Sequence, residues 1–218
     1  MRTVDLSLPI AAGMPVYPGD PEVGVDTALT IDRDGVAVAR LDMGSHTGTH
    51  LDAPAHSIPG GRTVDEIPLD VLWGEAAILQ ASVAAGVSIS CDDIAGGVPA
   101  QLPTIVCIAT GWDRHFGSSL MEAHPSLSME LVHMLWDRGA RVLGVDMLSP
   151  DRSAGSNSLS MDVHQHWLGG DGVIVENLTG LTTLPRSVDI SLLPLKIRAI
   201  DGSPVRAVAR FAEGSVAA

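Results

Sequence analysis

Short apolar or alternating segments recur along the whole chain. Runs of about four to eight residues with alternating or continuous apolar character are typical of strands, whereas amphipathic helices need longer stretches with a 3.6-residue period. On this basis the sequence predicts eight strands, over residues 3–8, 36–43, 76–81, 104–110, 141–146, 173–175, 191–200 and 205–211. Strands therefore outnumber helices.

Helical patterns are fewer. Residues 128–138 carry apolar side chains at helical spacing and are followed by a glycine, as is typical of a helix end. Residues 91–94 predict a short helix. Residues 162–168 predict another, with Ser160 or Asp162 as its N-cap.

The two kinds of element interleave without a linker, a repeat or a low-complexity segment. We therefore expect one domain over residues 1–218, of the α/β (mixed α+β) class with a mixed β-sheet core, rather than a doubly wound parallel sheet. The composition, 45% hydrophobic and 18% charged, is that of a globular chain. A chain of 218 residues can bury a large core without disulfides.

The chain is strongly acidic, with 13 basic and 26 acidic residues and a net charge of −13. This charge argues against binding to nucleic acid, and no polybasic run is present to hold an anionic membrane. The N-terminus has no signal-peptide pattern, and no apolar run is long enough to span a bilayer. Two cysteines are too few for a disulfide framework, and Cys107 lies in an apolar run as expected for an inert buried thiol. We expect a cytoplasmic protein.

Three histidines and one aspartate fall close together in S-H-T-G-T-H-L-D-A-P-A-H, namely His46, His50, Asp52 and His56. All four occupy even positions, so an extended chain projects them to one face. Neutral imidazoles with a carboxylate suit zinc, with manganese and iron(II) as alternatives. The segment therefore predicts a divalent metal site.

The spacing constrains that site further. Gly48 lies between the first two histidines, where a residue without a side chain leaves room for an ion. At about 3.3 Å per residue, His46 and His56 would lie roughly 33 Å apart in a straight strand, too far for one site. The chain must therefore turn near residues 52–54, and Pro54 suits a turn.

A second pattern lies in M-D-V-H-Q-H-W-L-G-G-D-G-V-I-V-E-N-L. His164 and His166 lie on the predicted helix, and Glu176 ends an apolar strand, where a carboxylate is costly unless it is paired or bound to an ion. Taken alone, this pattern favours a surface histidine and a strand-end glutamate.

The histidine segment H-T-G-T-H-L-D-A-P-A-H resembles the H-x-G-T-H-x-D-x-P-x-H signature of the metal-dependent cyclase family, which includes kynurenine formamidases and isatin hydrolases. Further blocks similar to the family follow in its order: D-L-S-L-P-I, M-P-V-Y-P-G-D-P, T-G-W, G-V-D-M-L-S-P-D, V-E-N-L and D-G-S-P-V-R-A-V. The resemblance implies the swivelling β/β/α fold of that family and a homodimer or higher homo-oligomer.

The family pattern also implies roles for individual residues. Five positions match metal ligands: His46, His50, Asp52, His164 and Glu176. The aspartate would bridge two ions per chain, zinc first and manganese as the alternative. His166 is the alternative to His164 as a ligand. The last histidine of the signature, His56, matches the family's catalytic acid/base.

The resemblance implies hydrolysis of an amide C–N bond through metal-activated water, with His56 moving the proton. The first expected substrate is N-formyl-L-kynurenine, giving kynurenine and formate in tryptophan catabolism. An isatin-like cyclic amide is the second. A cyclase or lyase reaction on a polyketide- or lactone-like substrate and a non-catalytic metal-binding protein are the remaining alternatives.

Two aromatic residues are candidates for binding the substrate. Tyr17 lies in a Pro/Gly-rich segment and Trp112 follows a predicted strand, where pocket loops often begin. For Trp112 a core position is an equal alternative. Residues 14–21 are apolar and proline-rich, and such a segment offers the apolar contact that an acidic chain needs to self-associate.

Overall fold

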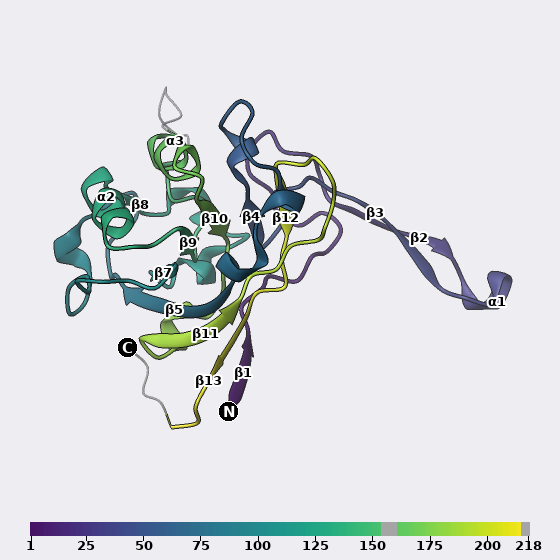
Figure 1. Cartoon of the computed structure of the whole chain (residues 1–218). Coiled ribbons are helices and arrows are strands. Elements are labelled where there is room, and N and C mark those ends of the chain that lie inside the picture. The colour runs from purple at the N-terminus through teal and green to yellow at the C-terminus, as the bar shows by residue number, and fades with distance from the viewer. Residues whose placement is uncertain (154–160, 215–218) are drawn as a thin grey trace.

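The computed structural model describes residues 1–153 and 161–214, and its main element is a curled, mixed sheet of nine strands (Figure 1). The strands follow the order β1-β13-β11-β5-β7-β9-β10-β4-β12. Their bounds are β1 (Arg2–Asp5), β4 (His50–Asp52), β5 (Trp73–Gln80), β7 (Ile105–Ala109), β9 (Val142–Val145), β10 (Val173–Glu176), β11 (Ser187–Ser191), β12 (Gly202–Pro204) and β13 (Val208–Phe211). The central β5, β7, β9 and β10 are parallel and the flanking strands antiparallel, which confirms the mixed sheet.

Two smaller sheets accompany the main one. β6 (Ser88–Ile89) pairs with β8 (Ser126–Leu127). β2 (Gly24–Leu29) and β3 (Val38–Asp42) form a hairpin with the short helix α1 (Ile31–Asp34) at its tip. This hairpin arm projects far from the main sheet (Figure 1).

The central strands of the main sheet are buried on both faces. Their successive residues point to opposite sides of the sheet and into two different cores. On β7, Ile105 and Cys107 belong to the core inside the curl, whereas Val106 and Ile108 face the helices. Burial raises the pKa of the Cys107 thiol to about 12, which confirms an inert buried cysteine.

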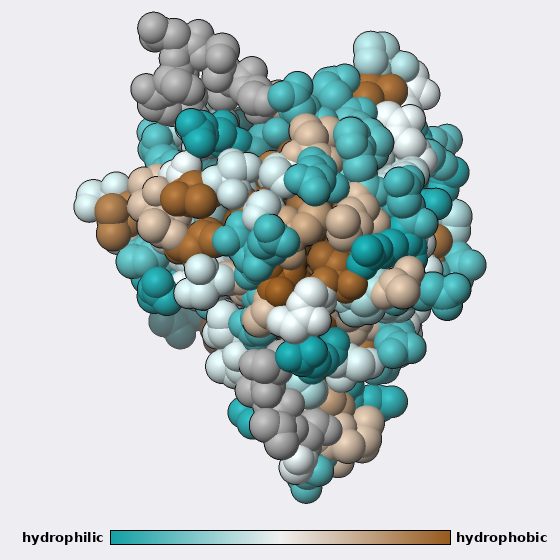
Figure 2. All heavy atoms as spheres, turned by 90° about the vertical axis from the view of Figure 1, so that its left-hand side faces the viewer, coloured by the Kyte–Doolittle hydropathy of each residue, from teal (hydrophilic) through white to brown (hydrophobic). Residues whose placement is uncertain are grey.

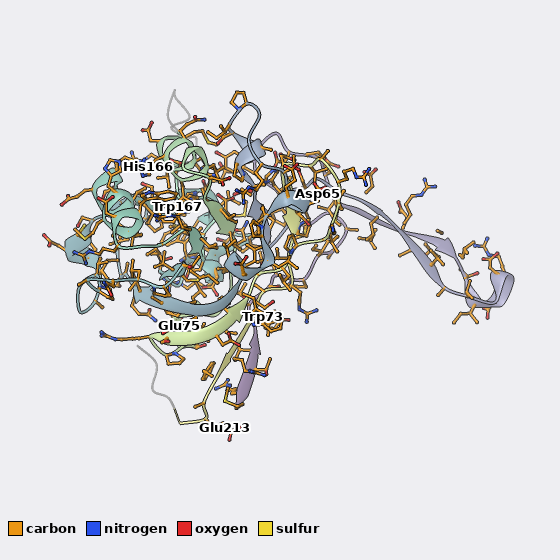
Figure 3. The ribbon with its side chains drawn as sticks, in the orientation of Figure 1. Asp65, Trp73, Glu75, His166, Trp167 and Glu213 are labelled. Atoms are coloured by element: carbon orange, nitrogen blue, oxygen red, sulfur yellow. The ribbon has the colours of Figure 1, made fainter. Side chains whose placement is uncertain are left out.

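Two helices cover the outer face of the central strands. α2 (Met129–Asp137) and α3 (Asp162–Gly169) confirm the two longer helices predicted from the sequence, and a 3₁₀ turn at Cys91–Asp93 confirms the short one. Trp167 of α3 is fully buried, and it lies between the helices in Figure 3. Figure 2 views the side that carries α2 and shows hydrophilic side chains around a central area of apolar ones.

The N-terminus of α3 corrects one prediction. Ser160 lies outside the described residues, and Asp162 is the first helical residue rather than the N-cap. The backbone N–H groups of Val163 and His164 instead donate to the carboxylate of Asp151, at 3.0 and 3.1 Å. A distant side chain therefore caps the helix.

The predicted strand over residues 191–200 is wrong. β11 ends at Ser191, and the following segment forms an isolated β-bridge, between Pro194 and Val205, rather than a strand. Proline has no N–H to donate to a ladder, and Ala199 has a positive φ of 58° that breaks an extended run. The apolar residues Leu192, Leu193 and Ile200 of this segment pack on the core without belonging to a strand.

None of the helices within residues 1–153 and 161–214 has the length and apolar character needed to cross a membrane.

Replacing Gly144 on β9 by alanine should destabilise the fold by about 1–3 kcal/mol, the usual cost of overpacking a filled core. An added Cβ would lie 2.7 Å from Leu178 Cδ1 and 2.8 Å from Cys107 Sγ. The matched control is Gly24→Ala on the arm, where the nearest atom would lie at 3.5 Å. Urea unfolding followed by circular dichroism measures both, and equal midpoints would contradict this packing.

Candidate metal site

Strand pairing brings the distant parts of the site together. β4 lies between β10 and β12, with Glu176 opposite His50 and Gly202 opposite Asp52. Side chains directly opposite each other on antiparallel strands lie within contact distance. The register therefore places residues more than a hundred positions apart in sequence beside the histidine segment.

The histidine segment is extended only over His50–Asp52. His46 lies in a turn, and the 3₁₀ turn Pro54–His56 confirms the predicted change of direction. Gly48 has φ +64°, whereas an added Cβ would meet its nearest neighbours at an ordinary 3.4 Å. Glycine is therefore favoured here by the left-handed backbone rather than by space for an ion.

Asp52 lies at the centre of the site and is only 1% exposed. His46 Nδ1 is 2.6 Å and His50 Nε2 is 3.3 Å from its Oδ1, and His164 Nε2 is 3.7 Å from its Oδ2. Three imidazoles, from a turn, from β4 and from α3, therefore face one buried carboxylate.

Glu176 supplies a second buried carboxylate beside the first. Its Oε2 lies 3.4 Å from His50 Nε2, and its Oε1 lies 3.4 Å from His164 Nε2. The strand-end glutamate is thus part of the same cluster as the histidine segment.

His166 points away from this cluster. Its ring lies 4.6 Å from that of His133 and 5.8 Å from that of Trp136, both on α2, and Figure 3 shows it on the α2 side. Of the two alternatives left open by the sequence, His164 is the one that the fold brings to Asp52.

The second ring nitrogen of two histidines is held by an acceptor. His50 Nδ1 donates to the carbonyl of Gly48 at 2.9 Å, and His164 Nδ1 donates to Asp151 Oδ2 at 2.7 Å. Because these nitrogens carry a proton, Nε2 is the nitrogen of each ring that faces the two carboxylates and that would bind an ion held between them. Such an outer hydrogen bond is the usual partner of a metal-binding histidine.

His46 and His56 share one further carboxylate. Asp201 Oδ2 accepts from His46 Nε2 at 2.8 Å and lies 3.3 Å from His56 Nδ1. Partial burial raises the pKa of Asp201, but the hydrogen bonds from the two histidines outweigh burial and hold the pKa at about 2. Asp201 is therefore ionised at neutral pH.

The electrostatics of the cluster favour a cation. Burial lowers the pKa of His50, but the charges of Asp52 and Glu176 outweigh burial and hold it well above its ordinary value. Burial raises the pKa of Asp52, and the imidazoles, His50 first, hold it well below its ordinary value. Asp52 Oδ2 and Glu176 Oε1 are buried without a hydrogen bond from any described residue. Unpartnered carboxylate oxygens among imidazole nitrogens are a donor set that fits a divalent ion.

Two groups of three residues, which share Asp52, could each hold an ion, because the ligand atoms within each group lie within 4.8 Å of one another. One group is His46, Asp52 and His56, and the other is His50, Asp52 and Glu176. Distance alone therefore allows His56 as a ligand. Its side chain is nevertheless 26% exposed, against 3% for that of His50. His56 thus lies at the wetter edge of the cluster.

The cluster forms the floor of a pocket of about 340 Å³. The walls are largely apolar and include Pro15, Val16, Tyr17, Phe116, Leu148 and Met161. Asp20 also lines the pocket, and no Lys or Arg is among the described lining residues. The pocket therefore offers aromatic and apolar contact above a polar, charged floor.

The aromatic predictions have different outcomes. Tyr17 lines the pocket. Trp112 does not, because it is 6% exposed in the core beneath α2 and its indole N–H donates to the carbonyl of Leu120 at 3.3 Å. Its assignment as a substrate-binding residue is corrected, and Phe116 lines the pocket instead. Residues 15–20 also line the pocket, so this segment is not simply a free outer surface.

Sequence reasoning missed Asp151 and Asp201 as parts of the site. Both lie in the blocks G-V-D-M-L-S-P-D and D-G-S-P-V-R-A-V that resemble the family, and that resemblance was the available signal. Their histidine partners are 13 and 145 positions away for His164 and His56, so no local spacing shows the contact.

Comparisons with known proteins identify the family of the chain. Residues 4–152 match the family described as "Putative cyclase". The chain is 33% identical over 211 residues to "Kynurenine formamidase" of Paracidovorax citrulli (strain AAC00-1), covering 94% of this chain and 95% of that protein.

Solved structures share the fold. Isatin hydrolase A from Labrenzia aggregata, bound to benzyl benzoate, superposes with a TM-score of 0.81 at 23% identity, covering 95% of this chain and 93% of that one. The predicted metal-dependent hydrolase from Bacillus stearothermophilus has a TM-score of 0.76 at 27% identity, covering 95% and 97%. With the family match over most of its length and a relative at 33% identity, the chain belongs to the "Putative cyclase" family.

Proposed function

We propose that this protein is a metal-dependent hydrolase of an amide C–N bond, with N-formyl-L-kynurenine as its first candidate substrate. The observation that carries the proposal is the pair of unpartnered buried oxygens, on Asp52 and Glu176, among imidazoles at the floor of an apolar pocket. The relative named kynurenine formamidase and the solved metal-dependent hydrolases support the same reaction class.

The residues that would hold the metal form two overlapping sets about Asp52. His46 and His50 face its Oδ1, whereas His164 faces its Oδ2 and Glu176. We propose two ions per chain, zinc first and manganese as the alternative. A divalent ion bound there supplies Lewis-acid polarisation of the substrate carbonyl and acidifies water.

His56 is the residue proposed to move the proton. Its Nδ1 faces Asp201, so Nε2 is the nitrogen left to exchange protons at the pocket. It would take a proton as water adds to the carbonyl carbon and deliver that proton to the nitrogen as the C–N bond breaks. The delivery matters because an unprotonated amine is a poor leaving group.

The pocket lining also favours a second candidate substrate. The apolar and aromatic walls suit an aryl group, and no described lining residue is a Lys or Arg that would pair with a free carboxylate. A neutral, planar cyclic amide such as isatin therefore remains a specific alternative to the zwitterionic formylkynurenine.

The deciding experiment measures kcat/KM for N-formyl-L-kynurenine and for isatin with the zinc- and the manganese-loaded protein. Turnover of either substrate that is lost on chelation and restored by the metal supports the hydrolase, and the ratio of kcat/KM selects the substrate. A metal-loaded protein that turns over neither, nor any other aryl formamide or lactam, would exclude the proposal.

Three alanine variants distinguish a metal ligand from the residue that moves the proton. His50→Ala should lose metal and activity, because its Nε2 faces both buried carboxylates. His56→Ala should keep its metal and lose about 10²–10⁴-fold in kcat, the usual size of an acid/base effect. His166→Ala is the control and should change neither. Elemental analysis beside turnover measures all three, and metal loss in His56→Ala would make that residue a ligand.

We also propose that two copies of the chain associate through the hairpin arm. Val25 and Leu41 are paired on one face of the arm and both are exposed, whereas Asp26 and Arg40 are paired on the other. An isolated two-stranded ribbon is at best marginally stable in water. An identical arm supplies an apolar face of matching shape, and apolar contact offsets the repulsion between two acidic chains.

Leu41→Gln should therefore weaken self-association at least about tenfold, because a buried leucine contributes about 1.5–3 kcal/mol. Arg40→Gln, on the opposite face of the same strand, should leave it unchanged. Sedimentation analysis over a range of concentrations measures the association. A wild-type protein that stays at 22.7 kDa at micromolar concentration would refute the contact.

A further inference from the structure

One acidic residue of the site is neither in the buried carboxylate cluster nor among the residues matched to the family signature. Asp201 stands immediately before β12, the edge strand of the main sheet, which pairs with β4. Its side chain is 42% exposed, in contrast to Asp52 at 1%. A surface aspartate without contacts to other residues would be free to turn its side chain into solvent.

Asp201 is instead held from several sides. Its backbone carbonyl accepts from Ala53 N at 2.8 Å, directly between Asp52 and the turn that carries His56. Its Oδ1 accepts from the Ser45 hydroxyl at 3.0 Å. These contacts aim Oδ2 at the space between two imidazoles.

The two imidazoles in question are those of His46 and His56. Their ring centroids are 4.1 Å apart, and Asp201 Oδ2 lies 2.8 Å from His46 Nε2 and 3.3 Å from His56 Nδ1. The next residue, Gly202, leaves room for this arrangement, because a Cβ there would lie 2.5 Å from His46 Cε1. The loop before β12 is thus shaped around these rings.

We propose that Asp201 is a positioning residue that fixes, through one carboxylate oxygen, both a metal-facing imidazole and the imidazole that moves the proton. The inference rests on the proposed hydrolysis for its kinetic part only. A carboxylate accepts protons, so it selects the tautomer of each ring by receiving an N–H.

Each ring is left with one nitrogen for a different task. With Nε2–H given to Asp201, Nδ1 of His46, 2.6 Å from Asp52 Oδ1, is the nitrogen that would give up its proton to bind an ion beside Asp52. With Nδ1–H given to Asp201, His56 presents Nε2 to the pocket as a base. Orienting carboxylates of both kinds are known in general, for metal-bound and for catalytic histidines. Here the Asp201 side chain orients both histidines, so the position of His56 depends on that of His46.

The first test is Asp201→Asn, which keeps the shape and removes the charge. We expect apparent zinc affinity, measured by competition with a chromophoric chelator, to fall about 10–100-fold, and kcat to fall by a similar factor with KM little changed. The matched control is Ser45→Ala, which removes only the contact to Oδ1 and should lower either quantity by less than about tenfold. Melting temperature and circular dichroism establish that each variant is folded.

The second test asks whether Asp201 acts through His56. In a His56→Ala background, Asp201→Asn should still weaken zinc binding, because His46 remains, but at saturating zinc it should no longer lower the residual kcat. An equal loss of kcat with and without His56 would show a merely structural role and overturn the inference. Unchanged zinc affinity and kcat in Asp201→Asn would overturn it as well.

Asp201→Glu keeps the charge but displaces it by one methylene. It should lose kcat while remaining folded, and it serves for the same comparison if the asparagine variant does not fold. A fully active Asp201→Glu would overturn a role based on position. The zinc measurement does not depend on the substrate, so a protein that cleaves neither candidate amide would refute the proposed function and leave the His46 part of the inference decided by zinc alone.

Discussion

The burial of the Asp52 carboxylate is the constraint on which the rest of the site depends. An ionised carboxylate removed from water is costly unless opposite charge or hydrogen bonds compensate it. Here Glu176 lies in the same buried cluster and adds a second negative charge. His50 and His164 face both carboxylates and His46 faces Asp52, and these imidazoles compensate the charge fully only when they are protonated or when a cation lies among them. The need to balance the two buried negative charges therefore explains why imidazoles surround the two carboxylates.

Holding these groups together requires a rigid support, which the sheet and the outer hydrogen bonds provide. β4 has only three residues, yet it is paired on both sides, so its register fixes His50 and Asp52 against β10 and β12. An acceptor outside the cluster then holds the remaining ring nitrogen of each histidine: Gly48 O, Asp151 or Asp201. Packing, pairing and hydrogen bonding thus leave the imidazoles little rotational freedom.

Much of this was predictable from sequence where the signal is local. Central strands such as β7 are continuous apolar runs because both their faces are buried, and α2 shows its amphipathic period. The residue types of the histidine segment are by themselves enough to predict a metal site. The turn after Asp52 follows from the reach of the chain and from Pro54.

The remainder depends on long-range contacts that leave no local pattern. β4 and β12 are too short for a period of two to be recognised, and residues 192–200 are apolar without being a strand. Trp112 looks like a pocket residue in sequence, but the strand before it directs its ring into the core beneath α2. Asp151 and Asp201 act through histidines that are close only after the sheet has formed.

The strand order also has a consequence for how the protein is made. The histidine segment leaves the ribosome early, whereas Glu176 and Asp201 follow about 120 and 150 residues later, a delay of ~6–30 s at ordinary synthesis rates. β1 pairs with β13, about 200 residues later in the sequence, so the sheet cannot be completed before β13 has been made. During that interval three histidines and an aspartate are exposed on a nascent chain without their partners. Metal acquired then would be held by an incomplete set of ligands, so folding order favours metal loading after β10 and β12 have paired with β4.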